Sequence, residues 1–263
     1  MNIGDMGVPF IYQGEELIYP EYVKDGLVLH YDFSGMTNND ETKGIARDLS
    51  GNGNHGTLQN FNFTPESGYD KNKLLFDGVD DEIRESNLNK PPSSMTISLT
   101  MNITDKNTSM DALTWHTDIV IRVALTQGVT FIDKRRDVDR YKAEYKSNES
   151  GLNTMNITVV SSELKSEIYI NGEKRAELLE PMNDLEINKP LRWGTFGTSY
   201  GSMELHSTKI YNRPLMPEEI AHNYAIEKER FIISKEIAEE PKLNSLPISQ
   251  AAIGKTLKVG GAK

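Results

Sequence analysis

Pairs of carboxylates are the first side chains in this sequence that could do chemistry. Hydrolysis of a glycosidic bond with retention needs two carboxyl groups about 5 Å apart, and alternating acids on one strand would provide them. The segment DDEIRE (80–85) places Glu82 and Glu85 three residues apart, a spacing that points two side chains to opposite faces of a strand. The acids around Glu163 are no better spaced. We therefore predict that these carboxylates are solvated charges and that the chain has no catalytic residues.

The histidines show no pattern typical of catalysis or of zinc binding. No two of them have the H-x-x-x-H or H-E-x-x-H spacing that places zinc ligands on one helix face. Cysteine is absent, which excludes disulfides, thiolate catalysis and thiolate metal sites. We expect each histidine to be an ordinary surface or boundary residue: His30, His55, His116, His206 and His222.

Three ring-bearing side chains are the candidates for ligand binding. Sugar recognition needs a flat aromatic surface with polar groups beside it, and Trp115 and His116 follow a loop-like stretch, KNTSMDAL, while Tyr200 lies in FGTSYGS. The alternative is that Trp115 and Trp193 anchor the core, because buried Trp is common in β folds. Both interpretations of Trp115 stay open at the level of sequence.

Alternating apolar and polar residues dominate the middle of the chain. TISLTMNIT (96–104) and DIVIRVALT (118–126) each have one apolar and one polar face, which is typical of strands in a sheet covered on one side only. Asn171-Gly172 between strand-like flanks predicts a tight hairpin. The helical pattern appears only late, near 217–231, with Glu218 and Glu219 in its first turn. The sequence therefore predicts an all-β fold, an antiparallel two-sheet jelly-roll sandwich with one C-terminal helix and extended terminal arms.

Charge and hydropathy exclude several partners. The 263 residues carry a formal net charge of −10, which argues against nucleic acid as a partner. The single basic run, DKRRDVDR (133–140), is interleaved with Asp and indicates a solvated hairpin. No stretch approaches the roughly 18 consecutive apolar residues of a membrane span, so we expect no membrane insertion. The N-terminus lacks the pattern of a secretory signal.

Four stretches together resemble one family. DGLVLHYDFSG (25–35), ARDLSGNGNHGTLQNF (46–61), LLFDGVDDEI (74–83) and MELHSTKIYNRPLMPEEIAHNY (203–224) are similar, in order and spacing, to motifs of laminin G-like, concanavalin A-like lectin-glucanase jelly-roll domains. The resemblance covers roughly residues 25–225. It implies that the 48–56 loop is a structural connection, in which Asp48 and Ser50 bond neighbouring amides and Gly51, Gly53 and Gly56 permit positive φ. Phosphate binding there is excluded, because no Lys follows the glycines and no helix begins after them.

The resemblance also implies calcium as the one candidate cofactor. Some relatives hold Ca²⁺ at the rim of the sandwich with hard oxygen ligands. The residues that could contribute are Asp48, Asn52, Asp77, Asp80 and Asp81. The alternative, which we favour, is that the 77–81 acids only shape and solvate a turn.

The expected organisation is an N-terminal arm (1–24), the jelly-roll domain with its closing helix (25–225), and the helix end with an extended tail (226–263). Apolar residues in both end segments indicate that they become ordered on a partner. This layout is similar to that of tailed-bacteriophage structural proteins. We therefore expect a non-enzymatic virion protein, a homo-oligomer that docks on other virion proteins through its arms and presents the sandwich for adhesion to a cell-surface glycan. A bacterial carbohydrate-binding or adhesion module is the alternative, and a glycoside hydrolase on the same fold is the third.

Overall fold

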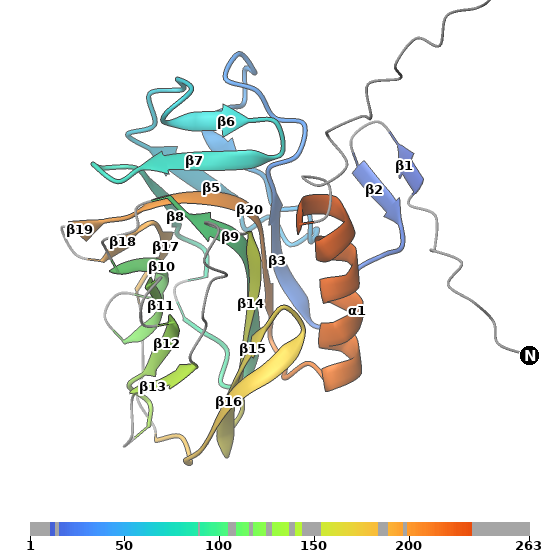
Figure 1. Cartoon of the computed structure of the whole chain (residues 1–263), viewed down its shortest axis with the longest axis vertical. Helices are drawn as coiled ribbons and strands as arrows, with labels where there is room; N and C mark the ends of the chain where they lie inside the picture. Colours follow the sequence, from blue (N-terminus) through green and yellow to red (C-terminus); the bar gives the residue numbers. More distant parts are fainter. Residues whose placement is uncertain are drawn as a thin grey trace, which may run out of the picture.

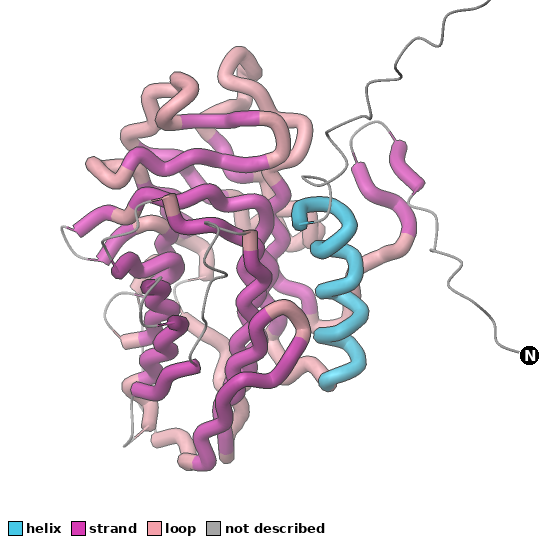
Figure 2. The backbone as a smooth tube through the Cα atoms, viewed as in Figure 1, coloured by secondary structure: helices cyan, strands magenta, loops and turns pink. Residues whose placement is uncertain are grey.

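A computed structural model describes residues 11–13, 16–88, 90–104, 109–115, 118–124, 128–136, 140–143, 154–183, 189–196 and 199–232. Two antiparallel sheets pack face to face, and one helix lies against the outside of one of them (Figures 1 and 2). The predicted all-β, two-sheet sandwich with a single C-terminal helix is confirmed. Within the described residues, no helix is long and apolar enough to cross a membrane.

The strands fall into two large sheets and two small ones. The first sheet has, in spatial order, β13 (Arg140–Ala143), β12 (Gly128–Asp133), β11 (Ile119–Ala124), β10 (Ser109–Trp115), β17 (Leu191–Trp193), β8 (Glu82–Glu85), β5 (Gly56–Gln59) and β4 (Ile45–Ala46). The second has β16 (Glu173–Leu179), β15 (Lys165–Ile170), β14 (Met155–Ser161), β9 (Met95–Ile103), β20 (Ser202–Tyr211), β7 (Lys73–Asp77) and β6 (Gly68–Asp70), and β3 (Leu27–Asp32) also pairs with β20. Two-stranded sheets are formed by β1 (Ile11–Gln13) with β2 (Glu16–Tyr19) and by β18 (Thr195–Phe196) with β19 (Ser199–Tyr200).

The core lies between the two large sheets, where the apolar faces of their strands meet. Ile97, Leu99 and Met101 of β9 and Ile119 and Ile121 of β11 are fully buried. Their alternation in the sequence therefore identified the inward faces correctly. The hairpin is also confirmed, since Asn171 and Gly172 have φ of 52° and 76° between β15 and β16.

The outer face of the second sheet is buried as well, which the sequence did not predict. Ser98 and Thr100 of β9 and Asn156 and Thr158 of β14 are at most 7% exposed. They bond one another, with Asn156 Nδ2 donating to Ser98 Oγ at 3.1 Å and to Thr100 Oγ1 at 3.0 Å. The prediction of a sheet covered on one side only is wrong here, because the C-terminal helix forms a third layer over these strands (Figure 1).

That helix, α1 (Pro217–Glu227), continues into one π-helical turn, Lys228–Ile232. Pro217 stands at its first position, and the Glu219 carboxylate accepts a hydrogen bond from the Met216 amide at 2.8 Å, so the start is capped. Near this end Ile220 packs on Tyr211 and Val160 of the second sheet. The helix predicted near 217–231 is confirmed.

At its other end the helix is held by buried charges. The Glu227 carboxylate bonds Lys209 of β20 and accepts a hydrogen bond from Ser207 Oγ at 2.6 Å, and Glu227 and Lys209 are at most 2% exposed. Burial by itself raises the pKa of Glu227, but the charges of Lys209 and Arg230 and the hydrogen bonds from Lys209 and Ser207 together outweigh it and lower that pKa from 4.5 to about 2. Three residues on, Arg230 pairs with Asp32 of β3 and donates to Ser34 Oγ at 3.2 Å.

The basic run at 133–140 is also not a solvated hairpin. Asp133, Arg135 and Arg136 are at most 4% exposed, and Arg135 forms an ion pair with Asp133 at 2.7 Å. Arg136 donates to Ser161 Oγ at 3.1 Å, which ties the end of β12 to β14 in the opposite sheet. The prediction is wrong because these charges neutralise one another between the sheets; residues 137–139 lie outside the described part.

The packed unit extends beyond the expected limits of 25 and 225. Glu21 to Lys24 run beside the helix, where the Val23 amide donates to Asn223 Oδ1 at 3.0 Å and the Glu21 carbonyl lies 2.8 Å from His222 Nε2. Glu227 and Arg230 pack at the other end. The expected N-terminal arm also contains β1 and β2, while residues 1–10, 14–15 and 233–263 of the two arms lie outside the described residues.

The Glu227–Lys209 pair gives a stability prediction. Replacing Glu227 with Gln leaves the buried Lys209 charge unmatched, and we expect the free energy of unfolding in urea at pH 7 to fall by about 3 kcal/mol. Glu227→Gln should also remove a stabilising contribution that the wild type loses as pH falls from 4.5 towards about 2. The matched control is Glu229→Gln, an exposed acid two residues on, which should change stability by less than about 0.5 kcal/mol. Equal losses in the two variants would contradict the role given to the pair.

Candidate functional site

The glycine-rich loop after β4 is a cap on the free edge of β3. Asp48 accepts hydrogen bonds at 2.9 Å from the amides of His30, Ser50 and Asn54. Asn54 Nδ2 donates to the Val28 carbonyl at 2.7 Å, and the Leu49 amide donates to the His30 carbonyl at 2.7 Å. The loop therefore supplies the partners that a neighbouring strand would have supplied. This confirms the structural role that the resemblance implies for Asp48.

The glycines of this loop act in two ways. Gly51 and Gly53 have φ of 87° and 75°, as expected. Gly56 does not have positive φ; a Cβ there would lie 2.8 Å from Ile83 Cγ2 and 2.9 Å from Tyr31 Oη. The expectation for Gly56 is thus corrected: this position needs glycine because the core approaches it closely.

The carboxylates of β8 are buried, so their prediction as solvated charges is wrong. Glu82 and Glu85 are 3% and 0% exposed. Glu85 accepts hydrogen bonds from the amides of Asn87 at 2.5 Å and Leu88 at 2.6 Å, and Glu82 pairs with Arg192 of β17. Both side chains therefore hold neighbouring segments of the first sheet in place.

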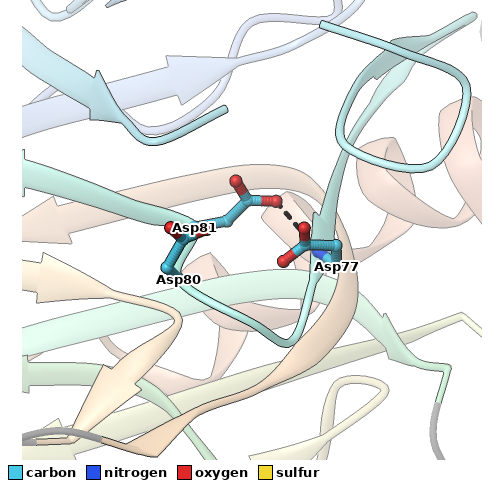
Figure 3. Close-up of side chains that lie close together, drawn as sticks. All are labelled: Asp77, Asp80 and Asp81. Atoms are coloured by element: carbon cyan, nitrogen blue, oxygen red, sulfur yellow. Dashed lines mark hydrogen bonds between the residues drawn. The ribbon is translucent and has the colours of Figure 1, made fainter. Parts of the chain in front are cut away.

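The three acids of the 77–81 turn do come together (Figure 3). Ligand oxygens of Asp77, Asp80 and Asp81 lie within 4.8 Å of one another. Asp81 is also a structural acceptor, for the Asp77 amide at 2.9 Å and for Ser67 Oγ at 3.0 Å. Burial raises the pKa of Asp81 from 3.8 to about 6, with the charges of Asp77 and Asp80 adding to the effect.

These three carboxylates are hard oxygen donors of the kind that calcium prefers. The other two candidates are not part of the group. Asp48 is committed to the β3 edge, and Asn52 Nδ2 donates to the Leu27 carbonyl at 3.0 Å in the same cap. Calcium at Asp77, Asp80 and Asp81 stays a prediction, beside the alternative that they shape the turn.

The predicted aromatic candidates are not brought together. Trp115 is fully buried at the end of strand β10, not in a loop, and its Nε1 donates to the Leu88 carbonyl at 2.8 Å. A buried ring offers no face to a sugar, so the structure places Trp115 in the core, the alternative that its sequence allowed. Tyr200 is half-buried in β19. The next residue, Gly201, packs on Met110, which lies on β10 five residues before Trp115. At the usual rise of a strand this places Met110 about 17 Å from Trp115. His116 lies outside the described residues.

The neighbouring letters GTSYG (197–201) match the G-x-S-x-G pattern of a hydrolase nucleophile. That pattern needs a sharp turn from a strand into a helix. Ser199 instead lies in β19, paired with Phe196 of β18 in a two-stranded sheet. The geometry of a nucleophile elbow is therefore not formed at Ser199.

A groove of about 490 Å³ lies beside β3, and no motif of the sequence contains it. We call it the β3 groove; its lining comes from the segment before β3, from β3, from the β4 region with its loop, and from the π-helical turn. Its size is in the usual range for small-molecule sites. Among the residues that line it are Tyr22, His30, Asp32, Ile45, Leu49 and Arg230.

Polar side chains gather at one side of the β3 groove. Arg230 bonds Asp32, donates to Tyr22 Oη at 3.0 Å and donates to Ser34 Oγ at 3.2 Å. His30 is 8% exposed, and its Nε2 has no hydrogen-bond partner among the described residues. Burial, and after it the positive charge of Lys209, lowers the pKa of His30 from 6.5 to about 3, so the ring is neutral.

The prediction that every histidine is a surface or boundary residue is wrong for His30, and equally for His206, which is 2% exposed. The physical reason is the outer layer, which is formed by the segment before β3 and by the helix with its π-helical turn. His30 lies under Tyr22 with ring centroids 5.2 Å apart, and His206 lies 5.2 Å from the ring of Phe231.

Comparisons with known proteins agree with the fold. No family model matches the sequence, and no curated protein sequence matches it. The binding domain of Paraclostridial Mosquitocidal Protein 1 is similar over 76% of this chain and 52% of its own, with a TM-score of 0.54 and 17% identity. The likeness to that binding domain is one of fold, a β-sandwich. This chain thus spans about half the length of that binding domain.

Two further structures show the same likeness. A Trypanosoma rangeli sialidase mutant with trans-sialidase activity matches 78% of this chain and 33% of its own, at a TM-score of 0.56 and 12% identity. Domain 4 of AbnA, a GH43 extracellular arabinanase from Geobacillus stearothermophilus solved with arabinotriose, matches 75% of this chain and 98% of its own, at a TM-score of 0.50 and 16% identity. At such identities the likeness establishes the fold alone.

The cap on β3 gives the first prediction from this site. Asp48→Ala removes the acceptor of three backbone amides, and we expect the free energy of unfolding to fall by about 3 kcal/mol, since each buried donor left unmatched costs about 1 kcal/mol or more. Glu41→Ala, at an exposed acid in the turn before β4, is the control and should be neutral. Equal urea midpoints for wild type and Asp48→Ala would contradict the capping role.

The turn at 77–81 gives the second prediction. If the acids only shape the turn, as we expect, the melting temperature is the same in calcium and in a chelator. Asp80→Asn should leave it unchanged, because the Asp80 backbone carbonyl, which the substitution keeps, accepts the hydrogen bond from Asn60 Nδ2 at 2.9 Å. A melting temperature that rises with calcium in the wild type but not in Asp80→Asn would instead establish the calcium site.

Proposed function

We propose that this protein is a non-enzymatic carbohydrate-binding module carried on a bacteriophage particle. The observation that carries the binding function is the match to nearly the whole of the arabinanase domain, 98% of a domain solved with an oligosaccharide. A complete sandwich of this size can therefore serve as a self-contained sugar-binding unit. The same fold in this chain has a groove of suitable size beside β3.

The use of the acids supports binding rather than hydrolysis. Glu82 and Glu85 support the first sheet, Asp133 pairs with Arg135 and Asp111 with Arg122. A retaining hydrolase needs two carboxylates that face one substrate. Carboxylates that already hold an ion pair or backbone amides are poorly suited to that task.

The placement on a virion rests on the motif order and on the end segments. Apolar residues in both ends suit docking onto neighbouring proteins, with the sandwich presented outwards, and a symmetric homo-oligomer would repeat the module. A bacterial adhesion module is the second candidate, favoured by the same likeness to binding domains. The two share the glycan-binding activity and differ in the particle that carries it.

We expect the purified full-length chain to bind immobilised bacterial surface glycans and to release no sugar from them over a long incubation. Array binding and chromatography of the supernatant measure the two properties, with heat-unfolded protein as the control. Cleavage products would overturn the non-enzymatic proposal, and an array without signal would overturn glycan binding. Capsid or tail genes beside its gene, and its detection by mass spectrometry in purified particles, are expected; its recovery only from bacterial surfaces would favour the second candidate.

A further inference from the structure

We propose that the β3 groove is the glycan site, and that it takes a neutral saccharide unit. This inference rests on the proposed function and adds to it a place and a class of sugar. Nothing in the likeness to other sandwiches locates a ligand on this chain. The lining of the groove does so.

The lip of the groove is aliphatic and exposed. Ile45 and Leu49 are 46% and 42% exposed, and both line the groove. Among the described residues, few large apolar side chains are as exposed as these, so two of them lining one groove mark a contact surface. The C–H face of a sugar ring fits such a lip.

The side of the groove near the helix offers fixed polar groups. Arg230 is held by Asp32, Tyr22 and Ser34, so the guanidinium and its carboxylate are ordered before a ligand arrives. Hydroxyl groups both donate and accept, and they can share such pre-organised donors and acceptors at little entropic cost. An apolar lip opposite a few fixed polar groups is the usual composition of a small-molecule site.

The charges of the groove select a neutral sugar. Its lining holds three cationic side chains, Lys24, Arg47 and Arg230, and three carboxylates, Glu21, Asp32 and Asp48, so the formal charge is zero. The whole chain carries −10. A sialylated, sulfated or phosphorylated sugar would meet no excess of positive charge here and would be repelled at longer range.

A peptide strand is a poorer occupant. Strand addition needs a long row of free backbone groups. β4, which borders the groove, is an edge strand of two residues, and the neighbouring edge of β3 is already capped by the 48–54 loop. A compact ligand therefore fits the groove better than an extended chain.

The test compares two double variants of the full-length chain. Ile45→Ser/Leu49→Ser alters the lip, and Leu164→Ser/Leu179→Ser, at side chains 73% and 72% exposed, is the matched control on another surface. All four side chains are exposed, so both proteins should fold, which melting curves verify. The probe is an array that carries each neutral glycan beside its sialylated or sulfated counterpart.

We expect the wild type and the control to bind the same neutral glycans. The lip variant should bind them about tenfold more weakly in solution titrations, a loss of about 1.4 kcal/mol. Binding should be nearly independent of ionic strength, since no net charge is paired. Equal binding by the lip variant, or preference for the acidic member of each pair, would overturn the groove assignment while leaving glycan binding intact.

Two other results would overturn it for different reasons. If the wild type binds no glycan on the array, the proposed function fails and the groove assignment fails with it. If light scattering shows that the lip variant separates an oligomer into monomers while glycan binding is unchanged, the lip is a contact between copies of this chain.

Discussion

The buried ion pair between Lys209 and Glu227 is the contact on which the outer layer of this protein depends. β20 crosses the middle of the second sheet, and its outward side chains at 207 and 209 are polar and almost fully buried. Lys209 could not remain charged there without a counter-charge, because removing an ammonium group from water costs several kcal/mol. Glu227 supplies that charge from the last turn of α1 and also accepts from Thr100 and Ser207. The helix is thus fixed at one end by apolar packing and at the other by charge.

The same arrangement shapes the β3 groove. Once Glu227 fixes the end of α1, the π-helical turn brings Arg230 over β3, where Asp32 and Ser34 meet it. Tyr22 completes the cluster, with its hydroxyl on Arg230 and its ring 3.7 Å from Lys209 Nζ. From the other side, Asp48 draws the loop against the edge of β3. One wall of the groove therefore follows from helix anchoring and the other from edge capping.

Most of the sandwich could be predicted from the sequence, because local patterns encode it. Period-2 alternation identified the inward faces of β9 and β11, and Asn171-Gly172 identified a hairpin whose two residues both need positive φ. The polar faces were misjudged for one physical reason. Alternation shows which residues avoid water, but it does not show whether polar residues are solvated or paired under another layer. This is why the predictions of exposure were wrong for four residues. Each is buried, beside partners distant in the sequence or held by backbone amides: His30, Glu82, Glu85 and Arg135.

The candidate site was harder to predict, since no motif contains it. Its residues come from the segment before β3, from β3, from the β4 loop and from the end of the helix, and they meet only after folding. The one local signal was weak: Ile45 precedes the glycine-rich signature and Leu49 lies within it, and apolar side chains beside so many polar residues would need a contact. Asp48, Ser50 and Asn54 bond the backbone of β3, so these polar side chains of the signature are structural. The apolar side chains beside them form the lip that we propose for a ligand. A site with no net charge on an acidic protein would bind each sugar weakly, so repetition of the module on a particle would be an effective way to raise its avidity.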